Sequence, residues 1–319
     1  MNAAVVSSYD APPRFGSFEE PVAGEGEVLV DVSAAGLHPI VKSLANGSHY
    51  GSTGVFPFVA GVDGVGRLAD GRRVFFGSAR GPFGTFAERA VAREAMLLEL
   101  PDGLDDAVAA GLANPAMSSW AALTVRAKFV AGESVLILGA TGVAGQLAVQ
   151  IARRLGAKRV IAAGRNPVAL EKLKALGADA VISLEQEKAA LVEAFRAEIA
   201  GGVDVVLDYL WGAPAESVLA AIAKKGLSHS SARIRFVQVG NSAGATITLA
   251  GATLRSSGLE LLGSGFGSAS LAEIFAAVKE FFKEAAVRPF DVEIKAVPLE
   301  DVESVWGGAE KGARVVFRP

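Results

Sequence analysis

Apolar strands and amphipathic helices alternate through the middle of the chain. Residues 134–140 and 159–164 are continuous apolar runs, the pattern of strands that are buried on both faces. Residues 145–157 and 167–178 predict amphipathic helices, and each contains a Gly-Ala pair at its end that favours a helix stop. The alternation continues with strands predicted at 180–184, 203–210 and 234–240 and helices at 187–200 and 215–225. It predicts βαβ units and a doubly wound parallel sheet, an α/β fold.

The two ends of the chain follow a different pattern. Short stretches rich in valine and phenylalanine, separated by Gly and Pro, predict an irregular β domain before residue 95, with strands at 26–37, 72–79 and 84–92. Residues 105–128 are alanine-rich and predict a helical segment. After a Gly/Ser-rich stretch near 263–270, the pattern predicts a helix at 270–287, a strand at 291–299, a helix at 299–312 and a strand at 313–319. We expect these C-terminal strands to return to the first domain.

Composition removes several classes of function. The chain of 319 residues is long enough for two domains, and it has no cysteine, which excludes disulfides, thiolate catalysis and cysteine-ligated metal sites. Its three histidines, His38, His49 and His229, show no metal-binding spacing, and His229 lies in a polar loop that we expect at the surface. The net charge of −3 without a basic block favours neither nucleic acid nor an anionic membrane as a partner. Neither a signal peptide nor a membrane span is predicted, so a cytoplasmic protein is expected.

A glycine motif carries the strongest functional signal. Gly139, Gly142 and Gly145 follow one predicted strand directly and open the next helix. Glycines in such a turn let the backbone approach a pyrophosphate, and the helix N-terminus offers free N–H groups and a positive dipole end. We predict that Gly139, Thr141, Gly142, Val143 and Ala144 bind a dinucleotide. The alternative is that the glycines serve packing alone.

The end of the following strand selects the cofactor. NAD-binding chains place an acid there, which holds the ribose 2′-hydroxyl. This chain has Gly164-Arg165-Asn166 instead, and a guanidinium suits a 2′-phosphate. The pattern favours NADPH over NADH and predicts that these three residues contact the cofactor. The alternative for Arg165 is a solvated loop residue.

Seven segments in this order resemble a known family, the medium-chain dehydrogenase/reductase superfamily in its zinc-independent quinone oxidoreductase-like branch. They are AAGLHP (34–39), FPFVAGVDGVG (56–66), GPFGTFAERAVA (81–92), the glycine motif, LGADAVISL (176–184), VDVVLDYLWG (203–212) and GARVVFRP (312–319). The resemblance implies a GroES-like irregular β-barrel catalytic domain at 1–117, a Rossmann nucleotide-binding domain at 118–262 and a return to the catalytic domain at 263–319. It also implies a homodimer.

The resemblance bears on zinc and on the catalytic residues. Zinc alcohol dehydrogenases of the superfamily use Cys and a Gly-His-Glu segment as ligands, where this chain has His38 and the segment 60–63, Ala-Gly-Val-Asp. We therefore expect no metal site. His38 replaces a family Asn beside the nicotinamide, and it could hydrogen-bond a carbonyl oxygen, donate a proton, or only shape the cleft wall. Tyr50 is a second candidate donor.

Further cofactor contacts follow from the same resemblance. Ser119 falls near a family Thr that approaches the cofactor, with a helix cap as the alternative. Arg314 matches a family basic residue that could contact a cofactor phosphate, or merely a carboxylate. Val239, Gly240 and Asn241 follow the fifth strand of the predicted sheet, and ligands lie at such carboxyl ends, so they are predicted to contact the cofactor. Gly265 and Phe266 are predicted to close over the nicotinamide ring. Asp63 and Asp208 are interpreted as structural acids, the first holding a turn and the second capping a turn or helix.

These observations predict an oxidoreductase that transfers hydride from NADPH to a small acceptor without zinc. The acceptor would be a quinone, an enone or an enoyl group. Two alternatives stay open at this point: a nonspecific carbonyl or alcohol dehydrogenase, and a protein that binds or senses NADPH without catalysis.

Overall fold

The structure is a computed structural model that describes residues 1–319 except 78–79, 224–231, 266 and 309–311. Internal contacts divide the chain into two units, residues 1–114 with 279–319, and residues 115–278. The predicted division into a catalytic and a nucleotide-binding domain, with boundaries after residues 117 and 262, stays a prediction.

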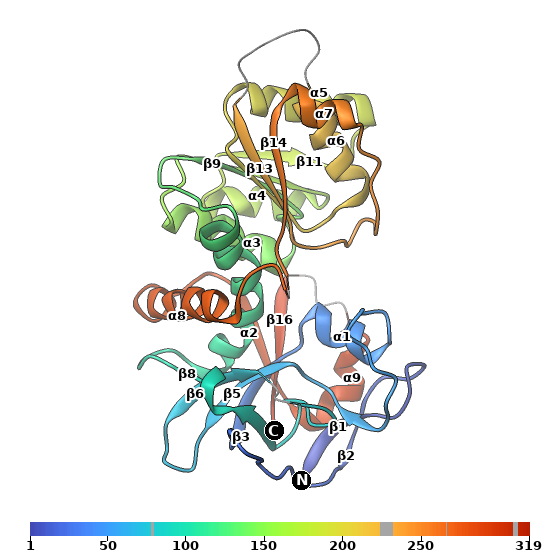
Figure 1. Ribbon diagram of the computed structural model, residues 1–319, viewed down its shortest axis with the longest axis vertical. Helices are drawn as coiled ribbons and strands as arrows, with labels where there is room; N and C mark the ends of the chain where they lie inside the picture. The colour runs from blue at the N-terminus through green and yellow to red at the C-terminus, as the bar shows by residue number, and fades with distance from the viewer. Residues whose placement is uncertain (78–79, 224–231, 266, 309–311) are drawn as a thin grey trace. The chain divides into compact units, whose positions relative to one another are not determined.

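A six-stranded parallel sheet forms the centre of the unit 115–278 (Figure 1). The strands lie in the order β11-β10-β9-β12-β13-β14, which is the doubly wound order predicted for this region. Their bounds are β9 Ser134–Leu138, β10 Arg159–Gly164, β11 Ala180–Ser183, β12 Val205–Asp208, β13 Arg233–Gln238 and β14 Gly258–Gly263. The strand order reverses between β9 and β12. In such sheets a ligand binds at the carboxyl ends of the strands beside this switch point.

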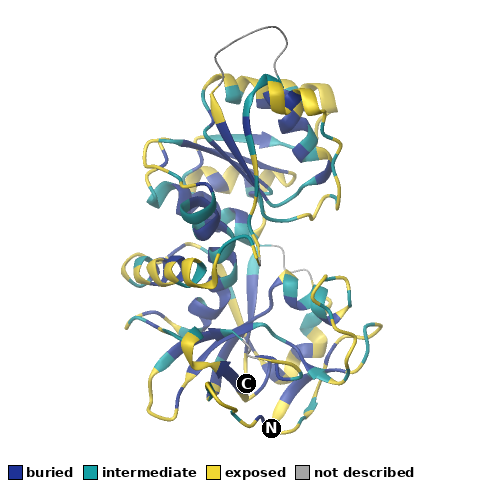
Figure 2. Ribbon diagram, in the orientation of Figure 1, coloured by how far each residue is buried: buried dark blue, intermediate teal, exposed yellow. Residues whose placement is uncertain are grey.

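Helices cover both faces of this sheet. They are α3 Val143–Arg154, α4 Pro167–Ala175, α5 Lys188–Ala200, α6 Gly212–Ile222 and α7 Gly251–Ser256, with a π-helical segment at Met117–Arg126. One face is closed by α5 and α6, whose Phe195 and Val218 pack in one core cluster with Leu136 and Ile161 of the sheet. The central strands β9, β10, β12 and β13 are mostly buried, and the helices expose their outer sides, as Figure 2 shows.

The predicted elements of this unit are confirmed, with two omissions. Every strand and helix predicted between residues 134 and 240 is present, and β10 has the predicted bounds of 159–164. The sequence analysis missed α7 and β14. β14 is only six residues long, and it directly follows the polar residues Arg255, Ser256 and Ser257.

The unit 1–114 with 279–319 is built on two mainly antiparallel sheets. One has the order β2-β1-β4, and the other β15-β16-β3-β5-β6-β8 with β7 paired to β3. The bounds are β1 Asn2–Val6, β2 Arg14–Ser17, β3 Glu27–Gly36, β4 Phe58–Val59, β5 Asp63–Arg67, β6 Arg73–Gly77, β7 Arg89–Arg93, β8 Leu98–Glu99, β15 Glu293–Pro298 and β16 Ala313–Arg318. The strand predicted over 84–92 is shorter than expected and begins at Arg89.

The C-terminal strands return to the first part of the chain, as predicted. β16 pairs antiparallel with β3, where Val316 lies opposite Gly36 and Phe317 opposite Ala35. Phe317 and Phe86 meet edge to face with ring centroids 4.9 Å apart, inside the core of this unit. The helices are α1 Pro39–Ala45, α2 Asp106–Ala116, α8 Leu271–Val287 and α9 Val302–Trp306, and of these α2 and α8 continue past the unit boundaries. The helix predicted at 299–312 is shorter, because its first residues, Leu299–Asp301, form a 3-10 turn.

No helix within the described ranges is long and apolar enough to cross a membrane.

Candidate functional site

Three glycines shape the turn between β9 and α3, each for a different reason. Gly139 has a φ of +84°, which side chains rarely adopt. A Cβ on Gly145 would lie 2.4 Å from the carbonyl oxygen of Gly139, so this glycine allows helix and strand to pack closely. Gly142 has an ordinary φ of −80°, and a Cβ there would meet only one atom within 4 Å, the Gly139 oxygen at 3.7 Å. Backbone conformation therefore explains Gly139 and packing explains Gly145, but the space above Gly142 is open.

The first turn of α3 faces this open space. Gly142 is its N-cap and provides no side-chain hydrogen bond, so the amides of Val143 and Ala144 have neither an intrahelical acceptor nor a capping side chain. Free amides at a positive helix end are suited to a phosphate oxygen. The residues present at this turn fit the pyrophosphate of a dinucleotide.

The end of β10 is hydrogen-bonded to the turn between β9 and α3. The carbonyl oxygen of Ala163 accepts from the amides of Gly139 and Ala140, at 3.0 and 2.9 Å. Thr141 lies against Gly164, and a Cβ added there would be 2.4 Å from Thr141 Cγ2. The structure thus brings together the predicted residues of the glycine turn and the predicted residue at the strand end.

The next two predicted residues are exposed. Arg165 is exposed, and it makes no ion pair or hydrogen bond with any other residue in the described part of the chain. Asn166 is the N-cap of α4, where its Oδ1 accepts from the amide of Ala169 at 3.1 Å. Asn166 therefore caps a helix, and its contact with a cofactor stays a prediction.

The residues after β13 and β14 lie at the same carboxyl edge of the sheet. The amides of Val239 and Gly240 donate to the carbonyl oxygen of Asp208, at 2.8 and 3.1 Å, so neither amide is free to donate to a ligand. Asn241 is exposed and lines a hollow together with Trp211, Gln238, Ala245, Leu261, Leu262 and Gly263. The amide of Gly265 donates to Ser268 Oγ at 2.8 Å. Phe266 and His229 lie outside the described residues.

Asp208 caps the turn after β12, as predicted. The carboxylate accepts from the amides of Leu210 and Trp211 in the turn after β12. Burial raises the pKa of Asp208 to about 6, and these amide hydrogen bonds oppose the rise. The turn holds Trp211 at φ +56° and ψ −159°, a region of backbone conformation used almost only by glycine. Sequence analysis missed this strained residue, because no local pattern marks a tryptophan for positive φ.

Ser119 is fully buried in the π-helical segment. Its hydroxyl donates to the carbonyl oxygen of Pro115 at 2.8 Å, four residues earlier, so Ser119 does not cap a helix. Tyr209 follows β12, and its hydroxyl donates to the carbonyl oxygen of Ser118 at 3.2 Å. Burial holds the pKa of Tyr209 above its ordinary value. This side chain ties the π-helical segment to the carboxyl edge of the sheet.

In the other unit, His38 and Asp63 form a buried pair. His38 Nε2 lies 3.2 Å from Asp63 Oδ1. Within the described part of the chain, neither imidazole nitrogen nor Asp63 Oδ1 has a hydrogen bond of good geometry. The imidazole lies against Gly36, where a Cβ would be 2.4 Å from Nε2. Asp63 begins β5 and does not hold a turn, so that interpretation was wrong; a strand start next to His38 places its carboxylate inside the core.

Arg314 belongs to the same buried group. It is 9% exposed, and its guanidinium donates to the carbonyl oxygen of Leu37 at 3.0 Å. Burial lowers the pKa of Arg314 to about 10, while the charge of Asp63 acts in the opposite direction. The structure therefore brings three predicted polar side chains together in one unit.

Tyr50 is placed differently. It is 80% exposed, and its ring lies beside that of His49 with centroids 4.1 Å apart. His49 Nδ1 in turn accepts from the amide of Gly51. The role of Tyr50 stays a prediction.

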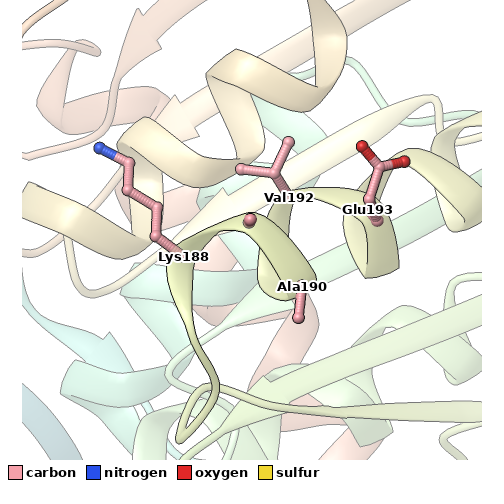
Figure 3. A pocket seen from close by; sticks show the side chains of 5 residues that line it. Lys188, Ala190, Val192 and Glu193 are labelled. Carbon is pink, nitrogen blue, oxygen red and sulfur yellow. The ribbon is translucent and has the colours of Figure 1, made fainter.

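No group of three or more His, Asp or Glu side chains that could hold a metal ion occurs among the residues that the structure describes. A second hollow lies beside α5 and is lined by Lys188, Ala189, Ala190, Val192 and Glu193 (Figure 3). All five come from one helix, and they include none of the predicted site residues.

The chain is similar to several known proteins. A family model described as zinc-binding dehydrogenase matches residues 143–284. A probable NADPH-dependent quinone reductase, tdiC of Emericella nidulans, is 27% identical over the full length of both chains. An NADPH-dependent alkenal/one oxidoreductase of Arabidopsis thaliana is 31% identical over 59% of this chain and 53% of its own. The solved quinone oxidoreductase of Thermus thermophilus, also determined with NADPH, is 28% identical and superposes over all of both chains with a TM-score of 0.80.

Proposed function

The chain belongs to the medium-chain dehydrogenase/reductase superfamily, in its quinone oxidoreductase-like branch, and on that premise we propose that it is an NADPH-dependent reductase of quinone, enone or enoyl-type acceptors that works without zinc. The observation that carries the proposal is the turn between β9 and α3. Its Gly142 is required neither by backbone conformation nor by packing, and it leaves the free amides of Val143 and Ala144 open. A ligand that needs close approach to backbone explains this glycine.

The residues of this turn would hold the pyrophosphate, and Arg165 would hold the 2′-phosphate. Arg165 follows β10, is exposed, and forms no ion pair with any other described side chain. A free guanidinium at this position is matched to a phosphate, which it can bind through two hydrogen bonds. Bound NADPH would supply a hydride from C4 of its nicotinamide to an electron-poor carbon.

Independence of zinc is proposed from the residue types available. Thiolate ligands are excluded because the chain has no cysteine, and Val62 and Asp63 stand where zinc relatives place His and Glu. The NADPH-dependent relatives act, by their names, on quinones and on alkenals or alkenones. Such acceptors need a hydride and a proton but no Lewis acid to activate a saturated alcohol.

His38 is the proposed source of a hydrogen bond or proton for the acceptor oxygen, with Tyr50 second. Both imidazole nitrogens of His38 lack a well-formed hydrogen bond within the described chain, so an N–H is available to donate. The neighbouring Asp63, whose Oδ1 lies 3.2 Å from Nε2, would fix the orientation of the ring.

A homodimer is proposed from the exposed edge of the parallel sheet. β14 pairs with β13 and with no other strand in the described ranges. Its outer edge presents unpaired backbone groups, which a second copy of the same strand can satisfy. A cytoplasmic location stays a prediction.

Cofactor titration tests the central claim. Binding of NADPH and NADH is measured on the wild type, on Arg165→Ala and on Arg196→Ala, a control arginine on α5 that is ion-paired to Glu193. We expect Arg165→Ala to weaken NADPH binding about 10- to 100-fold and to leave NADH binding unchanged, because one charge-assisted contact is lost. Equal affinities of the wild type for both cofactors would remove the NADPH assignment.

Turnover separates the enzyme from its alternatives. Oxidation of NADPH is followed with a panel of quinones and enones, and in parallel the reduction of NAD with saturated alcohols. Turnover of the first panel alone supports the proposal. Activity with saturated alcohols identifies an alcohol dehydrogenase, and tight NADPH binding without turnover identifies a binding or sensing protein.

A further inference from the structure

Thr141 of the glycine turn fills the space next to Gly164. A Cβ built on Gly164 would lie 2.4 Å from Thr141 Cγ2, 2.9 Å from its Oγ1 and 3.2 Å from its Cβ. Two of these distances are shorter than the contacts that real Cβ atoms make. Two of the three staggered positions on Thr141 Cβ face Gly164, and threonine carries heavy atoms at two of the three positions, so rotation about χ1 leaves at least one heavy atom against the site.

Backbone conformation does not demand a glycine here. The φ of Gly164 lies outside the left-handed region, in contrast to Gly139, whose φ is +84°. Gly164 is also the last residue of a regular parallel strand, where it lies opposite Ser183 of β11. Among the described residues, only the side chain of Thr141 explains why position 164 is a glycine.

Backbone hydrogen bonds hold both residues in place. The turn that carries Thr141 is held to β10 by the two hydrogen bonds that the amides of Gly139 and Ala140 donate to the oxygen of Ala163. On the other side, the carbonyl oxygen of Gly164 accepts from the amide of Leu184 at 2.8 Å. A side chain at 164 would therefore displace the phosphate-binding turn itself.

We propose that Thr141 is a cofactor-selecting residue, because it excludes from position 164 the acid with which NAD-binding chains hold the ribose 2′-hydroxyl. The proposal rests on the proposed function, in which NADPH is the cofactor. Arg165 attracts a 2′-phosphate, and Thr141 independently keeps a competing carboxylate out of the same place. Selectivity is then set by two residues that lie on different elements, and exchange of the strand-end residue alone cannot reverse it.

The experiment introduces the acid with and without the obstacle. Dissociation constants for NADPH and NADH are measured for Gly164→Asp, for Thr141→Gly, and for the double variant. We expect Gly164→Asp alone to weaken both cofactors at least about tenfold, since the turn is displaced as well as a negative charge added. The double variant is expected to regain NADH binding about tenfold over Gly164→Asp, but not NADPH binding. Thr141→Val with Gly164→Asp is the matched control, because valine keeps the shape of threonine, and it should behave like Gly164→Asp.

A series of uncharged substitutions tests the clash between Thr141 and a side chain at position 164 without any cofactor. Thermal unfolding is compared for Gly164→Ala, Thr141→Gly and their combination, so that the cost of extra glycine flexibility cancels in the cycle. We expect Gly164→Ala to lower Tm in the wild-type background and to cost clearly less when Thr141 is replaced by glycine. Additive effects on Tm, or NADH binding gained by Gly164→Asp alone, would overturn the proposal. A wild type that fails to bind NADPH, combined with non-additive Tm effects, would instead overturn the proposed function and leave the contact between Thr141 and Gly164 established.

Discussion

His38 Nε2 lies 3.2 Å from Asp63 Oδ1, with the two side chains 0% and 6% exposed. Arg314 lies near enough for the charge of Asp63 to raise its pKa against the larger effect of burial. One buried carboxylate is thus shared by a cation and an imidazole. Buried charges are tolerated when they are paired, and removal of one partner leaves the other with its full desolvation cost.

The first prediction concerns this pair. His38→Ala should lower the free energy of unfolding by about 1–3 kcal/mol, since the buried Asp63 loses a polar neighbour. His38→Asn should cost less, because an amide keeps a polar group beside the carboxylate. Urea unfolding of the three proteins measures the effect. Turnover is measured on the same samples: a folded His38→Ala protein with unchanged kcat would remove the proposed donor role, and unchanged stability would contradict the importance of the pair.

The glycine turn could be predicted from the sequence, because its strand, turn and helix follow one another directly in the chain. Gly139 and Gly145 have the structural roles expected of the motif, and the strand end at Gly164 was located to the residue. What sequence could not show depends on residues that are far apart in the chain. The clash between Thr141 and Gly164, and the burial of His38 against Asp63, arise only when separate elements meet. The strained Trp211 and the edge strand β14 also lack a local signal, since tertiary packing overrides residue preference at both.

The second prediction follows from the raised pKa of Asp208. Its pKa is about 6 in the folded protein against an ordinary 3.8, so the folded state binds the proton more tightly than the unfolded state. The contribution of Asp208 to stability is therefore greatest below about pH 4 and is lost as the pH rises to about 6. Asp208→Asn cannot titrate, and the wild type should lose about 3 kcal/mol relative to it across this window. Chemical denaturation from pH 4 to 7 measures the difference, with the exposed Asp102→Asn as control. A difference that does not vary with pH would contradict the assignment.

The third prediction tests the sheet edge. Leu261 of β14 is 38% exposed, and Leu254 of α7 is 45% exposed. Leu261→Lys places a charge on the strand that is proposed to pair with a second copy, where burial of that charge is costly. Light scattering after size exclusion should give about twice 32.7 kDa for the wild type and for Leu254→Lys, and a single 32.7 kDa for Leu261→Lys. A wild type that elutes with the mass of one chain would remove the dimer proposal.

The last prediction separates two glycines of the same motif. Gly142→Ala adds a Cβ whose nearest neighbour is 3.7 Å away, whereas Gly145→Ala adds one 2.4 Å from the oxygen of Gly139. We expect Gly145→Ala to lower the free energy of unfolding by about 1–3 kcal/mol through overpacking. Gly142→Ala should cost less than about 1 kcal/mol, as a change at a helix N-cap, yet weaken NADPH binding about tenfold or more, because the added carbon occupies the approach to the free amides of α3. Denaturation and cofactor titration on both variants measure the two effects separately. If Gly142→Ala binds NADPH as the wild type does, the pyrophosphate does not lie in the open space above this glycine, because a methyl group placed there would have blocked it.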